Sequence, residues 1–450
     1  MKNKILLYYP SFAAGRGETT LYIDIPLSVV ALAQGLDGCY PVQIIDQRLD
    51  ENYDVNNILK DVFIVGISAT TSCQITNGIK FAERVRKYDR DIKIIWGGWH
   101  PSLMPYETLK HESVDIVIIG QGDRIFRDLA DSLYMKKDIS NVPNLVFKTK
   151  DGEFISTPKA EYKDLQMPIS VRDGYKYIDI KKYIHSAWGN KRVLGYESSR
   201  GCPNNCAFCS ISSVFRRRWH GIEAGQIVED IKYLQSGYSI DAVHFFDNNF
   251  FVDKNRALKF ADLLKRNQIN LKWDGTTVVD QFLSFTDSDI ENLTSSGMYR
   301  VILGIESGDE EVLININKRH NNEQVLNLVR RCRDMGIMPS LSFMMGFPWN
   351  PKKDMLNTIK LIENIKKIYD KTEILLFIFS PYLGTPLYDI AKDYGMIFPD
   401  SLEGWSEFTY DRPNTPWLTD KLAHRMDRYL KFFGTKELDE NEYSFFTGFE

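Results

Sequence analysis

The sequence predicts an α/β protein with two strand–helix series. The first is a doubly wound, Rossmann-like parallel sheet, and the second is a partial (β/α)6 barrel of the TIM type followed by a small C-terminal helical cap. Two observations predict this. Short, continuously apolar runs alternate with amphipathic stretches in both halves, as in parallel sheets covered on both faces. A polar, proline-containing segment separates the halves, and 450 residues are enough for two domains.

The first series occupies residues 1–140. Its expected strands are Lys4–Tyr9, Val42–Asp46, Phe63–Ser68, Lys93–Trp96 and Asp115–Ile119. Helical periodicity is clearest over Ile75–Tyr88, where apolar residues fall on one face. A sheet wound in this way binds ligands at the carboxyl ends of its strands.

Small residues follow three of these strands. They are Ser68 and Thr70, Gly97 and Gly98, and Gly120 and Gly122. Glycine lets a backbone approach a bulky ligand closely, but tight turns need glycine too. The residues alone therefore leave both a ligand cradle and ordinary turns open.

The second series follows a linker over residues 141–185, which includes a small hairpin around Asp151-Gly152. The barrel is expected over 186–390, and 391–450 form the aromatic helical extension. The expected barrel strands lie near Val193–Ser198, Ala242–Phe246, Leu271–Thr276, Arg300–Ile305, Pro339–Met344 and Ile374–Phe379. Barrels of this type place their chemistry at the carboxyl ends of the strands.

Three of the six cysteines form a tight group directly after the first barrel strand. Cys202, Cys206 and Cys209 follow a Cys-x3-Cys-x2-Cys spacing. Thiolates spaced in this way can hold one soft-metal centre from a single loop, and three ligands on a four-iron cluster leave one iron open. The alternative is a zinc site with His220 as fourth ligand, although structural zinc sites commonly use two cysteine pairs.

Composition excludes some functions. The net charge is −4 with acids and bases interspersed, so no nucleic-acid partner is expected. No apolar run is long enough for a transmembrane helix, and the apolar start ends at Pro10 without a small-residue cleavage site. We expect a cytoplasmic protein with no membrane partner.

The segment Ser199–Cys209, including the aromatic Phe208 before the last cysteine, resembles the radical S-adenosylmethionine (SAM) superfamily. The resemblance implies that Cys202, Cys206 and Cys209 ligate a 4Fe-4S cluster. It implies that the open iron binds SAM, and that reduction cleaves SAM to a 5′-deoxyadenosyl radical. It also implies an external electron donor such as flavodoxin or ferredoxin.

Further resemblances lie along the barrel rim. Asp247 and Asn249 belong to a segment similar to the family's second-strand motif, and Glu306 and Ser307 to one similar to its fourth-strand motif. The resemblance implies that these residues contact SAM. The alternatives are ordinary rim turns and, for Glu306, a salt bridge inside the barrel. Arg218 is expected either to bind an anionic group or to lie in a solvated basic loop.

The first domain resembles the cobalamin-binding subfamily of these enzymes at three strand ends: Gly66–Thr70, Gly97–Ser102 and Val114–Asp123. The resemblance implies that Ser68, Thr70, Gly97, Gly98, Gly120 and Gly122 bind cobalamin. The subfamily's Gly-Glu-Gly-Glu is replaced by Gly120-Gln121-Gly122-Asp123. Its members often lack the cobalt-ligating Asp-x-His-x-x-Gly motif, as does this chain, and His100 is expected to be a turn residue.

The resemblance implies cobalamin-dependent C-methylation of an unactivated carbon in a small metabolite or natural-product precursor. Two alternatives stay open. The first is a radical SAM cyclase, dehydratase or other rearrangement enzyme without methyl transfer, with or without cobalamin. The second is a non-catalytic iron–sulfur or corrinoid carrier.

Overall fold

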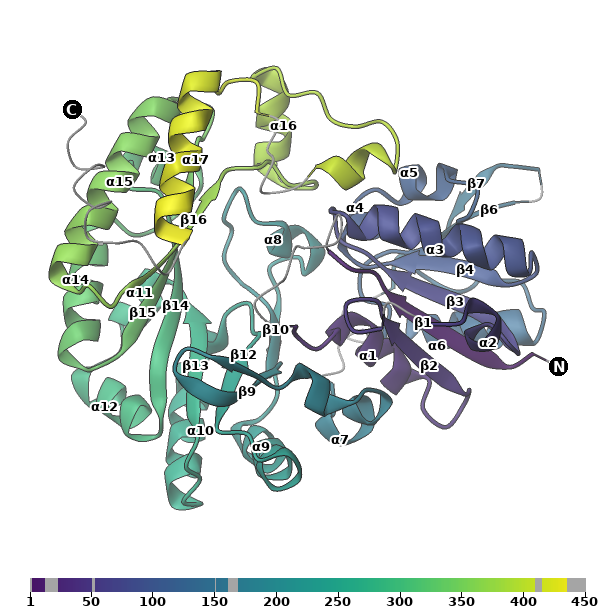
Figure 1. The fold of residues 1–450 in the computed structure, drawn as a ribbon, viewed down its shortest axis with the longest axis horizontal. Coiled ribbons are helices and arrows are strands. Elements are labelled where there is room, and N and C mark those ends of the chain that lie inside the picture. The colour runs from purple at the N-terminus through teal and green to yellow at the C-terminus, as the bar shows by residue number, and fades with distance from the viewer. Residues whose placement is uncertain are drawn as a thin grey trace.

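The computed structural model describes residues 2–12, 23–50, 53–149, 151–160, 169–408 and 415–434. Figure 1 shows two α/β bodies side by side, with the N-terminal sheet next to a larger, strongly curved sheet. Both expected strand–helix series are present. The contacts between these two bodies define the candidate site.

The N-terminal sheet has the strand order β2-β1-β3-β4-β5-β6-β7. Its strands are β1 (Lys4–Tyr9), β2 (Val42–Asp46), β3 (Val62–Ser68), β4 (Lys93–Gly97), β5 (Ile116–Ile118), β6 (Leu145–Lys148) and β7 (Phe154–Ser156). The first five pair in parallel. The helices are α1 (Leu27–Gly35), α2 (Val55–Ile58), α3 (Gln74–Tyr88), α4 (Trp99–Leu103), α5 (Pro105–Lys110) and α6 (Ile125–Tyr134). The five expected strands are confirmed to within two residues at each end.

The hairpin around Asp151-Gly152 is part of this sheet, whereas the sequence suggested a linker. β6 pairs antiparallel with β5, and β7 pairs antiparallel with β6. β5 has only three residues, and its outer edge would leave backbone N–H and C=O groups unpaired without β6. The first sheet therefore extends beyond residue 140, because edge pairing rather than periodicity places these two short strands.

The second sheet has the order β16-β15-β14-β13-β12-β9-β8 and curls into an open barrel. Its strands are β8 (His185–Ala187), β9 (Asn190–Tyr196), β12 (Ala242–Phe245), β13 (Lys272–Thr277), β14 (Met298–Glu306), β15 (Met338–Met345) and β16 (Glu373–Ile378). All pairs are parallel except β8 with β9. The six expected strands are thus present, and β8 adds a short antiparallel edge.

Helices cover the outer face of this sheet. They are α9 (Ala224–Tyr238), α10 (Lys254–Arg266), α11 (Val279–Leu283), α12 (Asp287–Ser295), α13 (Glu310–Asn315), α14 (Asn322–Asp334) and α15 (Pro351–Ile368). The short helix α7 (Val171–Gly174) precedes the barrel. Leu194, Phe245, Leu303 and Phe343 belong to the core between strands and helices, so the alternate residues of each strand face the barrel lumen.

The C-terminal extension contacts both bodies. It contains α16 (Pro386–Asp393) and α17 (Asp420–Gly434), and α17 packs against β16. Trp405 is completely buried and donates its Nε1–H to Glu107 of the first domain at 3.1 Å. The extension is therefore more than a barrel cap. Residues 409–414 and 435–450 of it lie outside the described residues.

Candidate active site

The cysteine loop leaves the barrel through a small hairpin. β10 (Ser199–Gly201) pairs antiparallel with β11 (Trp219–Gly221), so the expected first strand ends at Tyr196. Gly201 has φ +84°, and a Cβ there would lie 2.1 Å from the carbonyl oxygen of Arg218. Glycine is therefore required for the two hairpin strands to approach each other just before the first cysteine.

Asp247, a predicted cofactor contact, is fully occupied by protein groups. Its carboxylate accepts hydrogen bonds from the backbone N–H of Ser198 at 2.7 Å and from the hydroxyls of Ser198 and Ser199. Arg256 lies 3.5 Å away. Burial raises the pKa of Asp247, while Arg256 and the serine hydrogen bonds oppose the rise. The carboxylate thus ties the end of β12 to the hairpin that carries the cysteines.

The three cysteine side chains are half-buried on one loop. Burial raises the pKa of the Cys206 thiol, and it raises that of Cys209 to about 11. Within the described ranges, no three His, Cys, Asp or Glu side chains are gathered closely enough for a single metal ion. His220 is exposed and faces Arg200 across the hairpin. Three soft thiol donors from one loop fit an iron–sulfur cluster, because each cysteine binds a different iron and the three side chains need not converge on one ion.

Glu306 forms a buried ion pair beside this loop. Its Oε1 lies 2.9 Å from Nζ of Lys318, which also donates to the carbonyl of Gly304 at 2.8 Å. Lys318 lies 5.8 Å from the centre of the Phe208 ring. Burial lowers the pKa of Lys318, but Glu306 and Cys206 more than offset this, so the pKa is raised. The structure therefore shows the salt bridge that the sequence left open for Glu306, next to the cluster loop.

Ser307 points away from any open space. It is completely buried and donates its hydroxyl to Asp354 on α15 at 2.6 Å. Asp354 also accepts the backbone N–H of Gly346 at 2.8 Å, and burial raises its pKa to about 6. Ser307 thus fastens the end of β14 to α15 in this structure.

Asn249 and Arg218 occupy contrasting positions. Asn249 is buried and donates to Gln281 at 2.7 Å, but its Oδ1 is buried without a hydrogen-bond partner among the described residues. An unsatisfied buried oxygen is costly unless a ligand donates to it. Arg218 is exposed at the end of the hairpin. Of the predicted rim residues, Asn249 therefore best fits a ligand contact.

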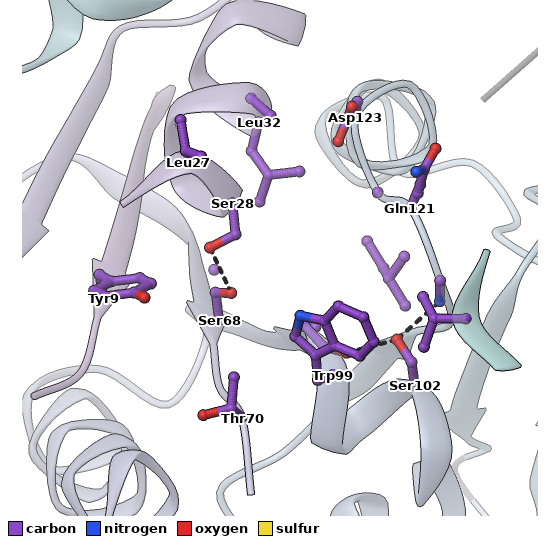
Figure 2. A pocket seen from close by; sticks show the side chains of 18 of the residues that line it. Tyr9, Leu27, Ser28, Leu32, Ser68, Thr70, Trp99, Ser102, Gln121 and Asp123 are labelled. Carbon is purple, nitrogen blue, oxygen red and sulfur yellow. Dashed lines mark hydrogen bonds between the residues drawn. The ribbon is translucent and has the colours of Figure 1, made fainter. Parts of the chain in front are cut away.

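A cavity of about 420 Å³ lies between the two domains. All six first-domain residues singled out from the sequence line it: Ser68, Thr70, Gly97, Gly98, Gly120 and Gly122. Figure 2 shows Ser68, bonded to Ser28 at 2.8 Å, and Thr70 on one side, and Gln121 and Asp123 on another. Residues around the cysteine loop, including Arg200, Phe215 and Asn248, complete the wall. The strand-end loops thus converge as the doubly wound fold requires.

The cavity wall fits a large polar ligand. A Cβ added at Gly120 would meet no atom within 4 Å, and one at Gly97 would meet only the Ile118 carbonyl oxygen at 3.9 Å. Both polar atoms of the Gln121 side-chain amide are buried without a hydrogen-bond partner among the residues that the structure describes. Cobalamin carries amide side chains that could satisfy such a group. His100 is absent from the wall: it is completely buried, bonds Thr71 at 2.9 Å, and contacts the Trp405 ring at 5.7 Å.

Sequence reasoning missed an ion-pair triad that joins the domains. Arg200 lies 2.8 Å from Asp123 of the first domain and 2.6 Å from Glu197. All three side chains are largely buried and line the cavity. Arg200 immediately precedes Gly201-Cys202, and Asp123 ends the Gly120–Asp123 segment. The two segments were singled out separately, and only the fold brings them into contact.

Comparison with known families identifies both domains. A family model described as "B12 binding domain" matches residues 18–130, and one described as "Radical SAM superfamily" matches residues 196–362. The chain belongs to the cobalamin-binding radical SAM family. The two family models accordingly give its cofactors as a 4Fe-4S cluster, SAM and cobalamin.

Similar curated proteins carry two kinds of activity in their names. The chain is 27% identical over 394 residues to "Uncharacterized methyltransferase PH0819" of Pyrococcus horikoshii, covering 86% of this chain and 83% of that protein. It is 26% identical to "Bacteriochlorophyllide d C-8(2)-methyltransferase" of Chlorobaculum tepidum, covering 82% and 75%. It is 25% identical to "Anaerobic magnesium-protoporphyrin IX monomethyl ester cyclase" of Synechocystis sp., covering 75% and 65%.

Solved structures share the fold. The radical SAM methyltransferase TsrM from Kitasatospora setae, with cobalamin and a [4Fe-4S] cluster bound, aligns with TM-score 0.66 at 17% identity. The alignment covers 88% of this chain and 79% of TsrM. The cobalamin-dependent enzyme OxsB aligns with TM-score 0.65 at 17% identity, covering 95% and 61%. Along the described residues, no helix combines the length and apolarity needed to cross a membrane.

Proposed function

We propose that this chain is a cobalamin-dependent C-methyltransferase that acts on a small molecule. The observation that carries the proposal is the shared cavity: loops of the B12-binding domain form one wall, and residues flanking the cysteine loop form the other. Held by the three cysteines, a reduced cluster would supply the electron for SAM cleavage, and cobalamin between the domains would supply the methyl group. The relatives named as methyltransferases support methyl transfer.

The chain's own residues have distinct roles in this proposal. Cys202, Cys206 and Cys209 hold the cluster, and Asp247 fixes the hairpin that precedes them through Ser198 and Ser199. Asn249 offers its unsatisfied Oδ1 to SAM. Because Phe208 and the Glu306–Lys318 pair lie beside the same loop, they shape the SAM site from the barrel side.

In the first domain, Gly97 and Gly120 leave room for the corrin, Gly98 and Gly122 line the cavity from the same two loops, and Ser68 and Thr70 offer hydroxyls at its edge. His100, on α4, does not line the cavity and its Nδ1 bonds Thr71, so it would not be among the residues that hold cobalamin. Domain assignments follow: 1–140 and the hairpin β6–β7 form the cobalamin domain, 186–390 the barrel, and 391–450 the extension. An external one-electron donor of the flavodoxin or ferredoxin class reduces the cluster.

The second candidate is a rearrangement enzyme, favoured by the similarity to anaerobic cyclases. By-products separate the two. Methyl transfer consumes two SAM molecules and two electrons, giving one 5′-deoxyadenosine with one methionine and one S-adenosylhomocysteine, and adds one CH2 unit to the substrate. A cyclase gives 5′-deoxyadenosine and methionine but no S-adenosylhomocysteine. We expect the anaerobic, reduced holoprotein to form both by-products, and the protein prepared without cobalamin to form 5′-deoxyadenosine alone.

The cluster assignment has its own control. Cys206→Ala should abolish 5′-deoxyadenosine formation and remove the iron–sulfur absorption, whereas Cys39→Ala should change neither, because Cys39 is exposed in the first domain. Native-rate 5′-deoxyadenosine formation by Cys206→Ala would refute the assignment. If the holoprotein with bound cobalamin forms no S-adenosylhomocysteine, the methyltransferase proposal is wrong and the chain is a rearrangement enzyme.

A further inference from the structure

Gln121 brings an unsatisfied amide to the cavity wall. It follows β5 between Gly120 and Gly122, and it lines the cavity between the two domains (Figure 2). Both polar atoms of its side chain, Oε1 and Nε2, are buried and have no hydrogen-bond partner in the described part of the chain. Oε1 accepts hydrogen bonds and Nε2 donates two. A buried group of this kind is costly unless a bound molecule satisfies both atoms.

Hydrogen bonds hold both ends of this loop. Ser102 on α4 accepts the backbone N–H of Gly120 at 2.9 Å and donates its hydroxyl to the carbonyl of Gly98 at 2.6 Å. At the start of α6, the backbone N–H of Phe126 bonds the carbonyl of Gly122 at 2.8 Å. The loop is therefore fastened on either side of the amide, and the backbone does not have to reorganise before a ligand binds to it.

The two amide atoms together restrict the chemistry of the ligand group. It has to donate a hydrogen bond to Oε1 and accept one from Nε2. An ammonium group only donates, and a carboxylate only accepts. A primary carboxamide does both, so two facing amides form a pair of parallel hydrogen bonds. The edge of an adenine does both too. The amide of Gln121 therefore favours a carboxamide or an adenine.

The cofactors offer one group of each kind, since cobalamin carries primary carboxamides around its corrin ring and SAM carries an adenine. The position of Gln121 favours the carboxamide. Residues 18–130, which include it, match the B12-binding family model, and the neighbouring Gly120 leaves open space in the cavity wall. Residues flanking the cysteine loop, beside which SAM binds in the proposed function, form the other wall.

The charges nearby disfavour an acidic group at the same place. Asp123, two residues further along the chain, and Glu197 both line the cavity, and they bind Arg200 at 2.8 and 2.6 Å. One arginine against two carboxylates leaves one negative charge in excess, on side chains that are largely buried. A ligand carboxylate beside Gln121 would meet this charge and would leave Oε1 without a donor. A neutral carboxamide avoids both costs.

The Gly-Glu-Gly-Glu pattern that this loop resembles has a glutamate at the position of Gln121. A glutamate would add a third carboxylate to Asp123 and Glu197, and an ionised carboxylate only accepts hydrogen bonds. Glutamine keeps the length of the side chain, removes the charge and adds a donor. In this chain the residue is therefore able to bond both atoms of a carboxamide.

We propose that Gln121 binds a peripheral carboxamide of cobalamin and so selects the fully amidated corrinoid over forms in which that side chain is a carboxylic acid. Nε2–H donates to the carbonyl oxygen of the ligand, and Oε1 accepts one of its N–H groups. Gln121 determines cofactor specificity and takes no part in the reaction. The inference rests on the proposed function only in placing cobalamin in this cavity.

A panel of corrinoids tests the contact: hydroxocobalamin and its monocarboxylic acids, in each of which one peripheral carboxamide is hydrolysed. Absorbance titration measures their affinities for the anaerobic protein with its cluster. We expect the wild type to bind at least one acid at least about ten-fold more weakly than hydroxocobalamin. Gln121→Leu, of similar size but without hydrogen-bonding atoms, should bind hydroxocobalamin at least about ten-fold more weakly and should no longer discriminate against that acid.

Two further variants sharpen the test. Gln121→Glu keeps an acceptor and adds a charge, so it should still bind hydroxocobalamin and should discriminate against the same acid more strongly than the wild type. Gln235→Leu on α9, whose amide bonds the carbonyl of Asn270 at 3.0 Å, is the matched control and should bind every corrinoid like the wild type. Iron per protein and melting temperature show whether each variant is folded.

Unchanged hydroxocobalamin affinity in Gln121→Leu would overturn the contact. An equal loss of affinity for every corrinoid would also overturn it, because Gln121 would then only support the loop. So would weaker SAM binding by Gln121→Leu without cobalamin, because the ligand group would then be the adenine. A wild type that binds all corrinoids alike contradicts the contact alone, whereas a wild type that binds no corrinoid contradicts the proposed function as well.

Discussion

The two walls of the candidate site differ in how their polar groups are satisfied. On the barrel side, Asp247, Glu306 and Ser307 are buried and bonded to protein partners. On the first-domain side, Gly97 and Gly120 leave open space, and within the described part of the chain Gln121 and Asp24 keep buried polar atoms without hydrogen-bond partners. Buried polar groups need partners, so the barrel side is largely satisfied within the protein, with Oδ1 of Asn249 as an exception, while the first-domain side is completed by a ligand.

This difference has a functional meaning. The barrel side must hold a loop of three cysteines in one shape, which requires rigid supports around it. The first domain must accept a bulky molecule, which requires open space and hydrogen-bonding groups that are not already bonded to other protein groups. Substitutions on the barrel side should therefore first reduce stability, and substitutions on the first-domain side should first reduce ligand binding.

The largest expected effect on ligand binding is at Gly97. Gly97→Leu should reduce bound cobalamin at least about ten-fold with little change in melting temperature, because the new side chain enters open cavity space. Cobalamin and iron per protein after desalting are the measurements, and iron should be unchanged. Gly98→Ala is the contrast: Gly98 has φ +96°, and its added Cβ would lie 2.7 Å from the Ala69 carbonyl oxygen, so the domain itself should lose stability. A Gly97→Leu protein that retains full cobalamin would break the comparison.

On the barrel side, Asp247→Asn should lower the free energy of unfolding by about 3–5 kcal/mol, because Arg256 is left buried beside a neutral group. Urea denaturation measures this. Asp262→Asn, at a partly exposed i,i+3 pair with Lys265, is the control and should change stability by less than about 0.5 kcal/mol. If Asp247→Asn were as stable as the control but bound SAM poorly, Asp247 would be a ligand contact after all.

A smaller effect is expected at His100, which lies behind the cavity wall. Burial lowers its pKa to about 4 from the ordinary 6.5, so between these values the unfolded chain binds the proton and the folded chain does not. Stability should therefore fall as pH drops from about 6.5 towards 4, by up to about 3 kcal/mol from this residue. The free energy of unfolding of the wild type and of His100→Phe, measured by urea denaturation at several pH values, should differ by an amount that changes with pH. That change isolates the contribution of His100. A pH-independent difference would show that His100 is protonated in both states or in neither.

Much of the architecture was available from the sequence. Continuous apolar runs predicted both sheets, because strands covered on two faces need apolar residues at every position. The spacing of Cys202, Cys206 and Cys209 predicted one metal-binding loop. Small residues after three strands left a ligand cradle or ordinary turns open, and the structure shows that they line a cavity. These features are local, so periodicity and spacing record them directly.

Tertiary structure decided the features that depend on residues far apart in the chain. The three-residue strand β5 needed β6 to pair its edge, and the Arg200–Asp123 ion pair joins segments 77 residues apart. Tertiary structure also decided whether a polar side chain near the site is bonded to another protein group or left open to a ligand. Glu306 found Lys318, and Ser307 found Asp354, whereas Asp24 found no hydrogen-bond partner for Oδ1 among the described residues. Sequence determines which groups can bond, but only packing determines which of them meet, because a buried polar group is satisfied by whatever the fold brings within reach.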